Sequence, residues 1–513
     1  MTYTSRTSSV PRLPAPRPIA VAELDLDGPD GKVLSLVPAP GGPPPGEGDI
    51  YALVRIEGRP VATVLGQVKP GEDPAEALAA AFRARKGDPY EDDDPGPRAA
   101  PAGGDLPRTT VVVATRERAG QLGRALDSLL AQDHPDFRIL VVDNAPVTTA
   151  TRDLVASRYA GRVGYVTEPR PGLAVAHNRG IADADGAVIA FTDDDVVADP
   201  HWLTALTAPF AADPALGCAT GLILPARLTT PAQILLESHG GFAKGFTPRL
   251  YDPAGPPADE PLFPFTAGSF GSGANMAFRA DALRAVGGFD PATGTGTPAR
   301  GGDDLYAFVR ILAAGHRLRY TPEALVWHHH RETWQDLRNQ AYGYGAGLTA
   351  YLTAILVRRP ALLPALLVRL PRGLAHARAI TAHRPGDGGA GGPAASATLG
   401  THGARHQWPR GLSRLERRGM LYGPLGYVKA RRQARSQERE RARGREREQG
   451  RERERDARGQ ERDARGRERD ARGRERDARG RERERDARGQ GETLGQGETL
   501  GQAGARRREE GPV

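Results

Sequence analysis

Three consecutive aspartates, Asp193, Asp194 and Asp195, follow an apolar run that starts at residue 188. The run predicts a buried strand, which would deliver three carboxylates to one point at the edge of a sheet. Carboxylates this close repel one another unless a cation or solvent lies among them. Hard oxygen ligands suit Mg²⁺ or Mn²⁺, and such ions commonly hold a substrate phosphate as well. An acidic turn is the alternative, but three acids behind a fully apolar strand favour a metal site.

The elements that would position these acids alternate between short apolar strands and helices. The pattern predicts strands at residues 110–115, 137–143, 163–167 and 188–193, and helices at 119–131, 148–158 and 173–184. Such alternation indicates βαβ units and a parallel sheet. Ligands of these sheets bind beyond the carboxyl ends of the strands. Thr115, Asp143 and Asp193 all stand at those ends.

The composition allows two or three domains and at least one unfolded segment. The chain has 513 residues, 39% of them hydrophobic, and a formal net charge of +8. Its single cysteine, Cys218, excludes an intramolecular disulfide and fits a reducing compartment. The first 20 residues lack the apolar core of a signal peptide. We therefore expect a cytoplasmic protein, with peripheral contact at the inner face of the cell membrane for the reasons given below.

The N-terminal part predicts a small module without recognisable chemistry. Residues 1–20 are expected to be disordered, and residues 21–86 to form a small α+β module with strands at 32–37, 51–56 and 60–65 and a helix at 74–83. Residues 87–107 are rich in Pro, Gly and Asp and predict a linker. The acidic triplet in this linker, at residues 92–94, follows no apolar strand, so we interpret it as solvated.

Residues 346–430 predict a helical, basic segment. Between Ile355 and Ala430 there are 12 Arg and Lys against 2 acids. The apolar run 348–370 is broken by two arginines and two prolines, which favours short amphipathic helices on an anionic membrane surface over a spanning helix. Ordinary packing against the catalytic domain is the alternative. No nucleic-acid partner is expected, because no recognition motif accompanies the charge.

Residues 431–513 predict a disordered, charged tail. The sequence DARG recurs with a seven-residue period, and residues 451–489 hold 16 Arg against 12 acids and no large apolar side chain. Such a segment buries too little surface to offset chain entropy, although Glu/Arg pairs favour transient helix.

Residues 110 to about 331 resemble the family 2 glycosyltransferases, whose nucleotide-sugar-binding domain has the GT-A fold. The matching segments, in the family's order, are VVVATRERAGQLGRALDSLLAQ, ILVVDN, EPRPGLAVAHNRGIADADGAVIAFTDDD, SGANMAFRADALRAVGGFD and GGDDLYAFVRILAAGHRLRY. They cover somewhat under half of the chain. The resemblance implies an α/β GT-A domain with a mostly parallel central sheet over residues 108–345. It also implies transfer of a sugar from a nucleotide donor with inversion at the anomeric carbon.

The resemblance assigns roles to the donor-binding residues. Thr115 and Arg116 match the position that lines the nucleotide pocket. Asp143 matches the acid that accepts a hydrogen bond from the donor base. Asn178 and Arg179 match the segment under the nucleotide. Arg179 could pair with a phosphate or with an acid of the site, and Asn178 could equally satisfy a backbone group.

The resemblance also assigns metal ligands. Asp193 and Asp195 match the ends of the family's metal motif, where the last acid usually binds the cation that bridges the diphosphate. The first acid usually faces the ribose or bound water, and Asp194 can do either. A histidine completes the metal shell in some relatives, which makes His328, at the end of a strand-like run, a candidate ligand.

Two further acids, Asp303 and Asp304, precede a predicted helix. Aligned on Arg310 and Gly315, Asp304 falls where the family carries its catalytic base, and Asp303 where it often has Glu. A role as helix cap is the alternative, since acids relieve the dipole at a helix start. Two adjacent acids readily supply a cap and a base together, and their repulsion raises a pKa, which a general base can use.

The sequence therefore predicts a metal-dependent inverting glycosyltransferase that uses Mg²⁺ or Mn²⁺. The donor would be a nucleotide sugar, with UDP the commonest base in the family, and the acceptor a hydroxyl of a glycan, such as a cell-wall polysaccharide, or of a lipid-linked glycan. One alternative is a sugar-phosphate nucleotidyltransferase of similar fold, but residues 114–120 lack its glycine-rich phosphate loop. A non-catalytic scaffold docked on a membrane or nucleic acid is the other, and the intact acids oppose it.

Overall fold

The computed structural model of the chain describes residues 17–84, 106–239, 241–369, 371 and 408–491. Our predictions for residues 1–16, for nearly all of the linker at 87–107, for 372–407 and for 492–513 lie outside the described residues.

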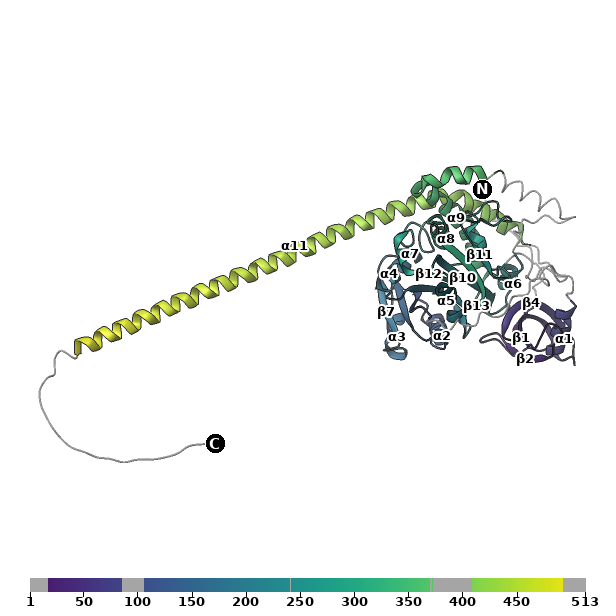
Figure 1. Cartoon of the computed structure of the whole chain (residues 1–513), viewed down its shortest axis with the longest axis horizontal. Coiled ribbons are helices and arrows are strands. Elements are labelled where there is room, and N and C mark those ends of the chain that lie inside the picture. The colour runs from purple at the N-terminus through teal and green to yellow at the C-terminus, as the bar shows by residue number, and fades with distance from the viewer. Residues whose placement is uncertain (1–16, 85–105, 240, 370, 372–407, 492–513) are drawn as a thin grey trace, which may run out of the picture. The chain divides into compact units, whose positions relative to one another are not determined.

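The N-terminal module is a four-stranded sheet with one helix, drawn in purple in Figure 1. Its elements are β1 (Ala20–Leu26), β2 (Val33–Pro38), β3 (Gly48–Ile56), β4 (Arg59–Val68) and α1 (Pro74–Arg83). The strand order is β2-β1-β3-β4, with β1 and β3 parallel. α1 begins where the Asp73 carboxylate accepts the amide of Ala75, and it buries Leu78 and Ala79 against the sheet. The predicted α+β module is confirmed, with β1 as an additional strand.

The central sheet has nine strands and follows the predicted alternation of strands and helices. Its strands are β5 (Thr109–Thr115), β6 (Phe137–Asn144), β7 (Val163–Glu168), β8 (Val188–Asp193), β9 (Val196–Ala198), β10 (Leu216–Pro225), β11 (Arg249–Tyr251), β12 (Asn275–Arg279) and β13 (Arg317–His328). The helices are α2 (Ala119–Leu129), α3 (Ala150–Arg158), α4 (Leu173–Asp183), α5 (Trp202–Ala212), α6 (Pro231–Ser238), α7 (Ala280–Ala285), α8 (Asp303–Ala313) and α9 (Trp334–Arg358), with 3₁₀ turns η1 (Ala267–Ser269) and η2 (Pro360–Leu362).

The strand order is β11-β13-β10-β12-β8-β5-β6-β7, and β9 pairs with β13. The pairs β8-β5, β5-β6, β6-β7 and β10-β13 are parallel, whereas β12 runs antiparallel between β10 and β8. Six strands, β5 to β8, β10 and β13, therefore run in one direction. The predicted mostly parallel α/β sheet is confirmed.

Both faces of the central sheet are buried, which explains why its strands are continuous apolar runs. Alternate residues of a strand point to opposite sides. In β8, Ile189 and Phe191 join one apolar cluster, while Val188 and Ala190 join another. Residues of α4, α7 and α8 pack in the first cluster and residues of α2, α3 and α5 in the second.

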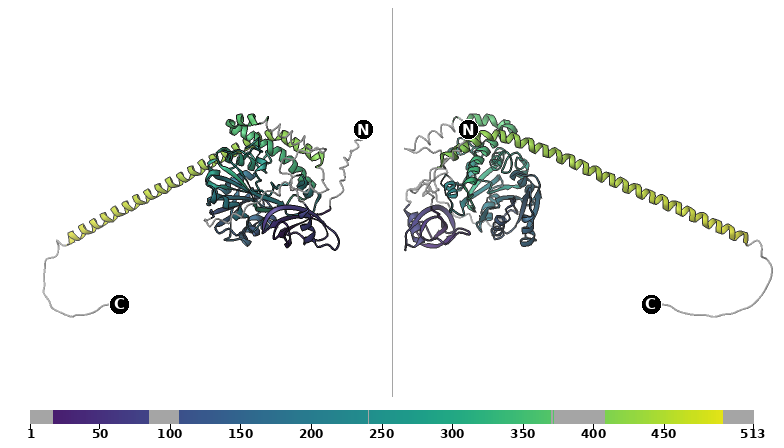
Figure 2. Two further views of the ribbon diagram at one scale, coloured as in Figure 1. Left: turned by 45° about the vertical axis from the view of Figure 1, so that its right-hand side comes forward. Right: turned by 180° about the vertical axis from the view of Figure 1, so that it is seen from behind.

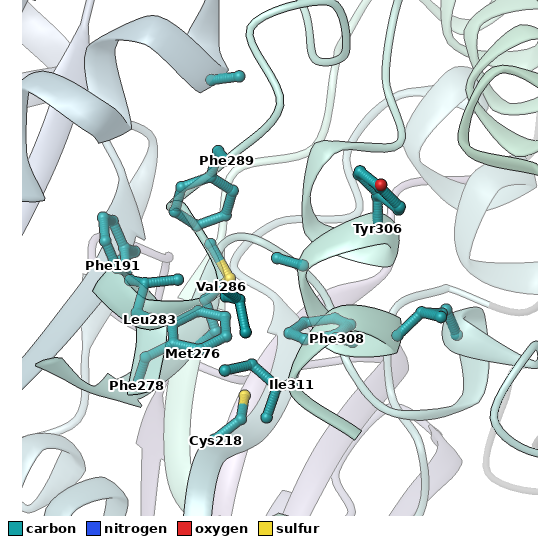
Figure 3. Packing of buried hydrophobic residues seen from close by; sticks show 14 of the residues in the cluster. Phe191, Cys218, Met276, Phe278, Leu283, Val286, Phe289, Tyr306, Phe308 and Ile311 are labelled. Atoms are coloured by element: carbon teal, nitrogen blue, oxygen red, sulfur yellow. The ribbon is translucent and has the colours of Figure 1, made fainter. Parts of the chain in front are cut away.

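Aromatic rings fill the centre of the first cluster, as Figure 3 shows. Phe191 of β8, Phe278 of β12 and Phe289 meet edge to face, with ring centroids 5.3–6.0 Å apart. Cys218 and Met276 lie beside them (Figure 3) and are fully buried. This packing fixes β8 and β12, the two strands next to the acidic residues, against the helix layer.

The N-terminal module shares a core with the central sheet. Tyr51 and Leu53 of β3 belong to the same apolar cluster as Leu224 of β10 and Trp327 of β13. Across this contact, the Arg55 guanidinium pairs with Glu23 at 2.7 Å and with Asp199 at 2.6 Å. Asp199 directly follows β9, so the module contacts the segment just beyond the three aspartates.

The first part of α11 (Arg410–Gly491) packs closely on α9 through small residues. A Cβ added to Gly419 would lie 2.1 Å from the carbonyl oxygen of Tyr342, and one added to Gly345 would lie 1.9 Å from that of Glu416. The Thr349 hydroxyl donates to the carbonyl of Met420 at 2.8 Å. Residues up to Ala434 form one compact unit. We had placed a domain boundary after residue 345, which lies inside α9, so this boundary is corrected.

The structure also differs from the disorder that we expected from residue 431 onward. α11 continues through Gly491 as a single helix, visible in Figures 1 and 2. Arg, Glu and Ala are strong helix formers, and opposite charges three or four residues apart add stability. Local propensity thus accounts for a helix whose described side chains beyond residue 437 are all exposed. Residues from Arg435 onward form a unit of their own.

No single helix in the described part of the chain has the length and apolar composition to cross a membrane. Two consecutive helices, Trp334–Arg358 and Pro360–Arg369, meet those criteria only together and are bent by 105°.

Candidate metal and nucleotide site

Parallel pairing brings the carboxyl ends of three strands to one edge of the central sheet. Thr115, which ends β5, lies opposite Asp143 of β6, and Ala114 lies opposite Asp193 of β8. The three positions that we expected at the strand ends therefore lie side by side.

Asp193, Asp195 and His328 form a group in which one ligand atom of each lies within 4.8 Å of the others. β8 ends at Asp193, and β9 then pairs with the end of β13, where Val196 lies opposite His328. The backbone amide of His329 donates to the carbonyl of Asp195 at 2.9 Å. These backbone contacts hold His328 Nε2 3.3 Å from Asp195 Oδ1.

This group fits a divalent cation. Two carboxylates and an imidazole are a donor set that Mn²⁺, and with more water ligands Mg²⁺, can use. Asp195 is 3% exposed, and its Oδ1 faces His328 Nε2 at 3.3 Å, with no other polar partner among the residues that the structure describes. A buried carboxylate oxygen with so few partners costs free energy, and a bound cation would offset that cost.

The pKa values of the three side chains shift in different directions. Burial and the neighbouring Asp195 raise the pKa of Asp193 to about 7. Burial acts the same way on Asp195, but His328, Arg331 and Arg118 outweigh it and hold its pKa below the usual range. Burial acts to lower the pKa of His328, but Asp195 raises it overall. Asp195 is therefore the permanently ionised member of the group.

Asp194 turns away from this group and anchors the loop after β5. Its carboxylate accepts the Thr115 hydroxyl at 2.7 Å and Arg118 Nη1 at 3.1 Å. The same Arg118 nitrogen lies 3.3 Å from Asp195 Oδ2. The structure thus gives Asp194 a role that we did not expect, which is to hold the end of β5 and the loop that carries Arg118. Arg116, expected at the nucleotide pocket, is exposed in that loop.

Asp143 offers a buried acceptor at the same edge. It is 1% exposed, and its Oδ2 accepts the Tyr165 hydroxyl at 2.8 Å. Its Oδ1 has no hydrogen-bond partner within the described ranges. Burial raises the pKa of this carboxyl. An acceptor with a spare lone pair is what recognition of a base N–H requires.

The side chains of Asn178 and Arg179 do not present unpaired polar groups at the edge of the sheet where the strands end. Both ends of the Asn178 amide bond the backbone of Phe289, at 2.8 Å each, which is the backbone role that we considered for it. Arg179 pairs with Asp183 one turn along α4, at 2.6 Å. The Asp183 carbonyl contacts Arg138 near the start of β6. Arg179 therefore lies toward the edge where the strands begin, and the phosphate contact is corrected.

The two acids of α8 occupy distinct environments. Asp304 is half-buried, and its Oδ2 accepts the amide of Gly273 at 2.9 Å while Oδ1 accepts that of Leu305 at 2.8 Å. Asp303 is 5% exposed and lies 3.8 Å from His177 Nδ1. Burial and Asp304, with a smaller effect of Asp193, raise the pKa of Asp303 to about 8. Burial also raises that of Asp304.

β12 connects the α8 acids to the end of β8. Asn275 lies opposite Thr192 in the antiparallel pair, and the Thr192 hydroxyl donates to the carbonyl of Ala274 at 2.9 Å. The next residue toward the N-terminus is Gly273, which binds Asp304. Together with the electrostatic effect of Asp193 on Asp303, this brings Asp304 to the same region as the Asp193, Asp195 and His328 group.

Four charged or polar residues near the site were missed from sequence. Arg118 and Arg331 each follow a strand end by three residues, which was the available signal, and Arg331 Nη2 lies 3.4 Å from Asp195. Lys244 acts electrostatically on Asp304 but comes from a loop with no motif. His177 is 1% exposed and packs between Phe191 and Phe289, with centroids 4.9 Å apart in each pair.

Known proteins are similar to the part of the chain that carries this site. Residues 107–342 match the model of the family described as Glycosyltransferase like family 2. A pre-mycofactocin glycosyltransferase of Mycobacterium tuberculosis is 28% identical over 256 residues, which is 49% of this chain and 49% of that protein. Validoxylamine A glucosyltransferase of Streptomyces hygroscopicus is 35% identical over 126 residues, 23% of this chain and 29% of that one. The chain thus spans about half or less of the length of these relatives.

Two solved structures are also similar to parts of the chain. A mannosyltransferase from Pyrobaculum calidifontis in complex with GDP-Man and Mn²⁺ is 20% identical, covers 63% of this chain and 87% of that one, and gives a TM-score of 0.39. GalNAc-T7 with UDP, GalNAc and Mn²⁺ is 18% identical, covers 50% of this chain and 52% of its own, and gives a TM-score of 0.36.

Proposed function

Because residues 107–342 belong to glycosyltransferase family 2, we propose that the protein is a metal-dependent inverting glycosyltransferase that moves a sugar from a nucleotide sugar to a hydroxyl group. The observation that carries the proposal is the Asp193, Asp195 and His328 group at the strand-end edge. It lies beside an open acceptor on Asp143 and next to the acids of α8. Nucleotide binding, departure of a diphosphate and proton removal each have a residue of suitable chemistry there.

The proposed mechanism is a single displacement. Asp143 accepts a hydrogen bond from the donor base. Asp193, Asp195 and His328 would hold a divalent cation, and its positive charge would offset the negative charge of the departing diphosphate. The acceptor oxygen forms a bond to the anomeric carbon as the bond to the phosphate oxygen breaks. The acceptor proton passes to Asp304, and attack from the opposite face inverts the stereocentre.

The proposal is tested by measuring nucleotide release from a panel of UDP-, GDP- and dTDP-sugars, with Mn²⁺, with Mg²⁺ and with a chelator. We expect release from at least one donor, with UDP-sugars first among the candidates, and loss of release with the chelator or in Asp195→Ala. NMR of the product should show the inverted anomer. Release that persists in the chelator would contradict metal dependence. No release from any donor would contradict the activity and favour the scaffold alternative.

We further propose that the acceptor is a glycan or lipid-linked glycan met at the inner face of the cell membrane, and that α11 contacts the lipid. Three apolar side chains of α11 share one face at spacings of four and three residues, Leu421, Leu425 and Val428, and they are 84%, 52% and 38% exposed. Exposed arginines extend the same stripe at positions 414, 418 and 432. An apolar stripe flanked by cations suits an anionic lipid surface.

The membrane contact predicts co-sedimentation with vesicles that contain phosphatidylglycerol and much weaker binding to phosphatidylcholine alone. The double variant Leu421→Glu/Leu425→Glu should lose this binding, because two charges would enter the apolar stripe. Val147→Glu, at an 80% exposed position elsewhere, serves as the control and should bind normally. Equal binding of the double variant and the control would exclude this face.

A further inference from the structure

A buried chain of hydrogen-bonding groups continues behind the candidate metal ligand His328. His328 Nδ1 lies 2.9 Å from His330 Nδ1, and His330 Nε2 lies 3.1 Å from Glu237 Oε2. The three residues are 8%, 2% and 1% exposed. Nothing in the sequence motifs pointed to Glu237, which comes from α6, almost a hundred residues earlier.

Local structure explains how these groups meet. Side chains alternate along an extended chain, so His328 and His330 face one side and His329 the other. On α6, Gln233 and Glu237 are one turn apart and share a face. The Gln233 amide donates to the His330 carbonyl at 3.2 Å, and a capping box at Thr230 fixes the start of the helix. α6 is thereby registered against the end of β13.

An aromatic ring packs against the two histidines of this hydrogen-bonded group. The Phe242 ring packs against both imidazoles, with centroids 5.2 Å from His328 and 5.5 Å from His330. A buried carboxylate in such surroundings costs free energy unless it is paired and hydrogen-bonded. In the described part of the chain, Glu237 Oε2 has His330 Nε2 as its polar partner, at 3.1 Å.

The order of donors and acceptors follows from these contacts. Between two facing Nδ1 atoms, one must donate and the other accept. If His330 Nε2 carries its proton, that N–H donates to the Glu237 carboxylate, and His330 Nδ1 is left as an acceptor. His328 Nδ1 must then be the donor. In the reverse order, a lone pair of His330 would face the Glu237 carboxylate, which is repulsive.

We propose that Glu237 and His330 are positioning residues that fix the tautomer of His328, with the proton on Nδ1 and the Nε2 lone pair directed at the cation. The inference rests on the proposed function, because it assumes that Asp193, Asp195 and His328 bind the metal. Partners behind a metal-bound histidine commonly fix its tautomer and orientation in this way, and losing one typically costs about 10–100-fold in metal affinity. Neither residue touches the substrate.

The test has a readout that needs no turnover. In the metal-free full-length protein labelled with ¹⁵N-histidine, the ¹⁵N chemical shifts should show that Nε2 of His330 carries a proton and that Nδ1 of His330 does not. Protonation of His330 at Nδ1 instead would overturn the proposal without any variant.

Mn²⁺ affinity supplies the second measurement, by the EPR signal of free Mn²⁺. Glu237→Leu should raise the Mn²⁺ Kd about 10–100-fold. Glu237→Gln is the conservative variant and should give a smaller rise, since its amide can still accept from His330 but can also turn to donate. Glu260→Gln removes another buried glutamate, 7% exposed and 3.8 Å from Arg249, and should leave the Kd unchanged.

Failure of this inference is distinguishable from failure of the proposed function. If the wild-type protein binds Mn²⁺ and both Glu237 variants bind it equally well, the positioning role is wrong while the metal site stands. If the wild-type protein binds no Mn²⁺, the metal dependence itself is wrong, and this inference falls with it.

Discussion

In the proposed mechanism Asp304 takes the proton of the acceptor hydroxyl, and two backbone amides fix its carboxylate. Asp304→Asn keeps the size and the acceptor oxygen but removes the base. We expect kcat to fall by about 10²–10⁴-fold, with little change in the affinity for the nucleotide donor. Steady-state nucleotide release and donor titration measure the two quantities.

Asp281→Asn is the matched control for that experiment. Asp281 also stands in the first turn of a helix, α7, and its carboxylate also accepts the amide of the next residue. The control should retain normal turnover, because only local capping changes. Turnover of Asp304→Asn within a few-fold of wild type would remove Asp304 as the base.

His177 gives the fold a predictable pH dependence. Burial lowers its pKa to about 3 from an ordinary value of 6.5. Between these values the unfolded chain binds a proton that the folded protein does not, so stability falls as the pH drops from 6.5 toward 3. The limiting slope is about 1.4 kcal/mol per pH unit for one proton. His177→Leu should unfold with a shallower dependence of Tm on pH over this window.

The exposed Val147 provides the comparison for His177. Its side chain is 80% exposed, and Val147→Ala changes no titratable group, so it should leave the pH dependence unchanged. Parallel Tm–pH curves for wild type and His177→Leu would show that the His177 ring does not govern acid stability.

At the residue scale, the sequence was most informative where the functional side chains are neighbours in the sequence. Asp193 and Asp195 follow one strand, so their grouping needed no knowledge of distant contacts. Arg331 and Glu237 reach the same region from other elements, and only the pairing of β9 with β13 and the placement of α6 bring them there. We predicted a phosphate contact for Arg179, but the structure pairs this side chain with Asp183 on its own helix.

At the scale of elements, apolar runs located β5 to β8 well, and burial of both faces makes this signal clear in β5, β6 and β8. The end of the domain was less predictable. α9 carries few charges and many small residues, and it belongs to the folded body because it packs in one core with α8 and is covered by α11. The contact with α11 joins segments about 70 residues apart, which no local pattern encodes.

The α9–α11 contact predicts a steric sensitivity at Gly419. A valine there would meet the backbone of Tyr342, because even a Cβ would lie 2.1 Å from its carbonyl oxygen. We expect Gly419→Val to lower the free energy of unfolding by about 1–3 kcal/mol or more, the cost that is typical of overpacking. Gly411→Val, where a Cβ meets no atom of the described chain within 4 Å, isolates the effect of valine in the helix. Equal Tm values for the two variants would contradict the packing.

At the scale of the whole molecule, the compact unit that ends at Ala434 predicts where the chain can be shortened. A protein ending after residue 434 should keep the Tm of the full chain, because residues beyond it add no buried side chains to that unit. A protein ending after residue 345 loses the second half of α9, including the buried Tyr351 and Ile355. It should unfold at a markedly lower temperature or fail to remain soluble. Circular dichroism melts compare the three lengths, and a normal melt for the shortest would refute this assignment.

The contact of Arg55 with Asp199 has a thermodynamic consequence. Asp199 lies four residues beyond Asp195, so the N-terminal sheet contacts the short stretch of backbone that carries two of the proposed cation ligands. If cation binding strengthens the Arg55–Asp199 contact, that contact must strengthen cation binding by the same factor. Loss of the contact would then weaken the affinity for the cation.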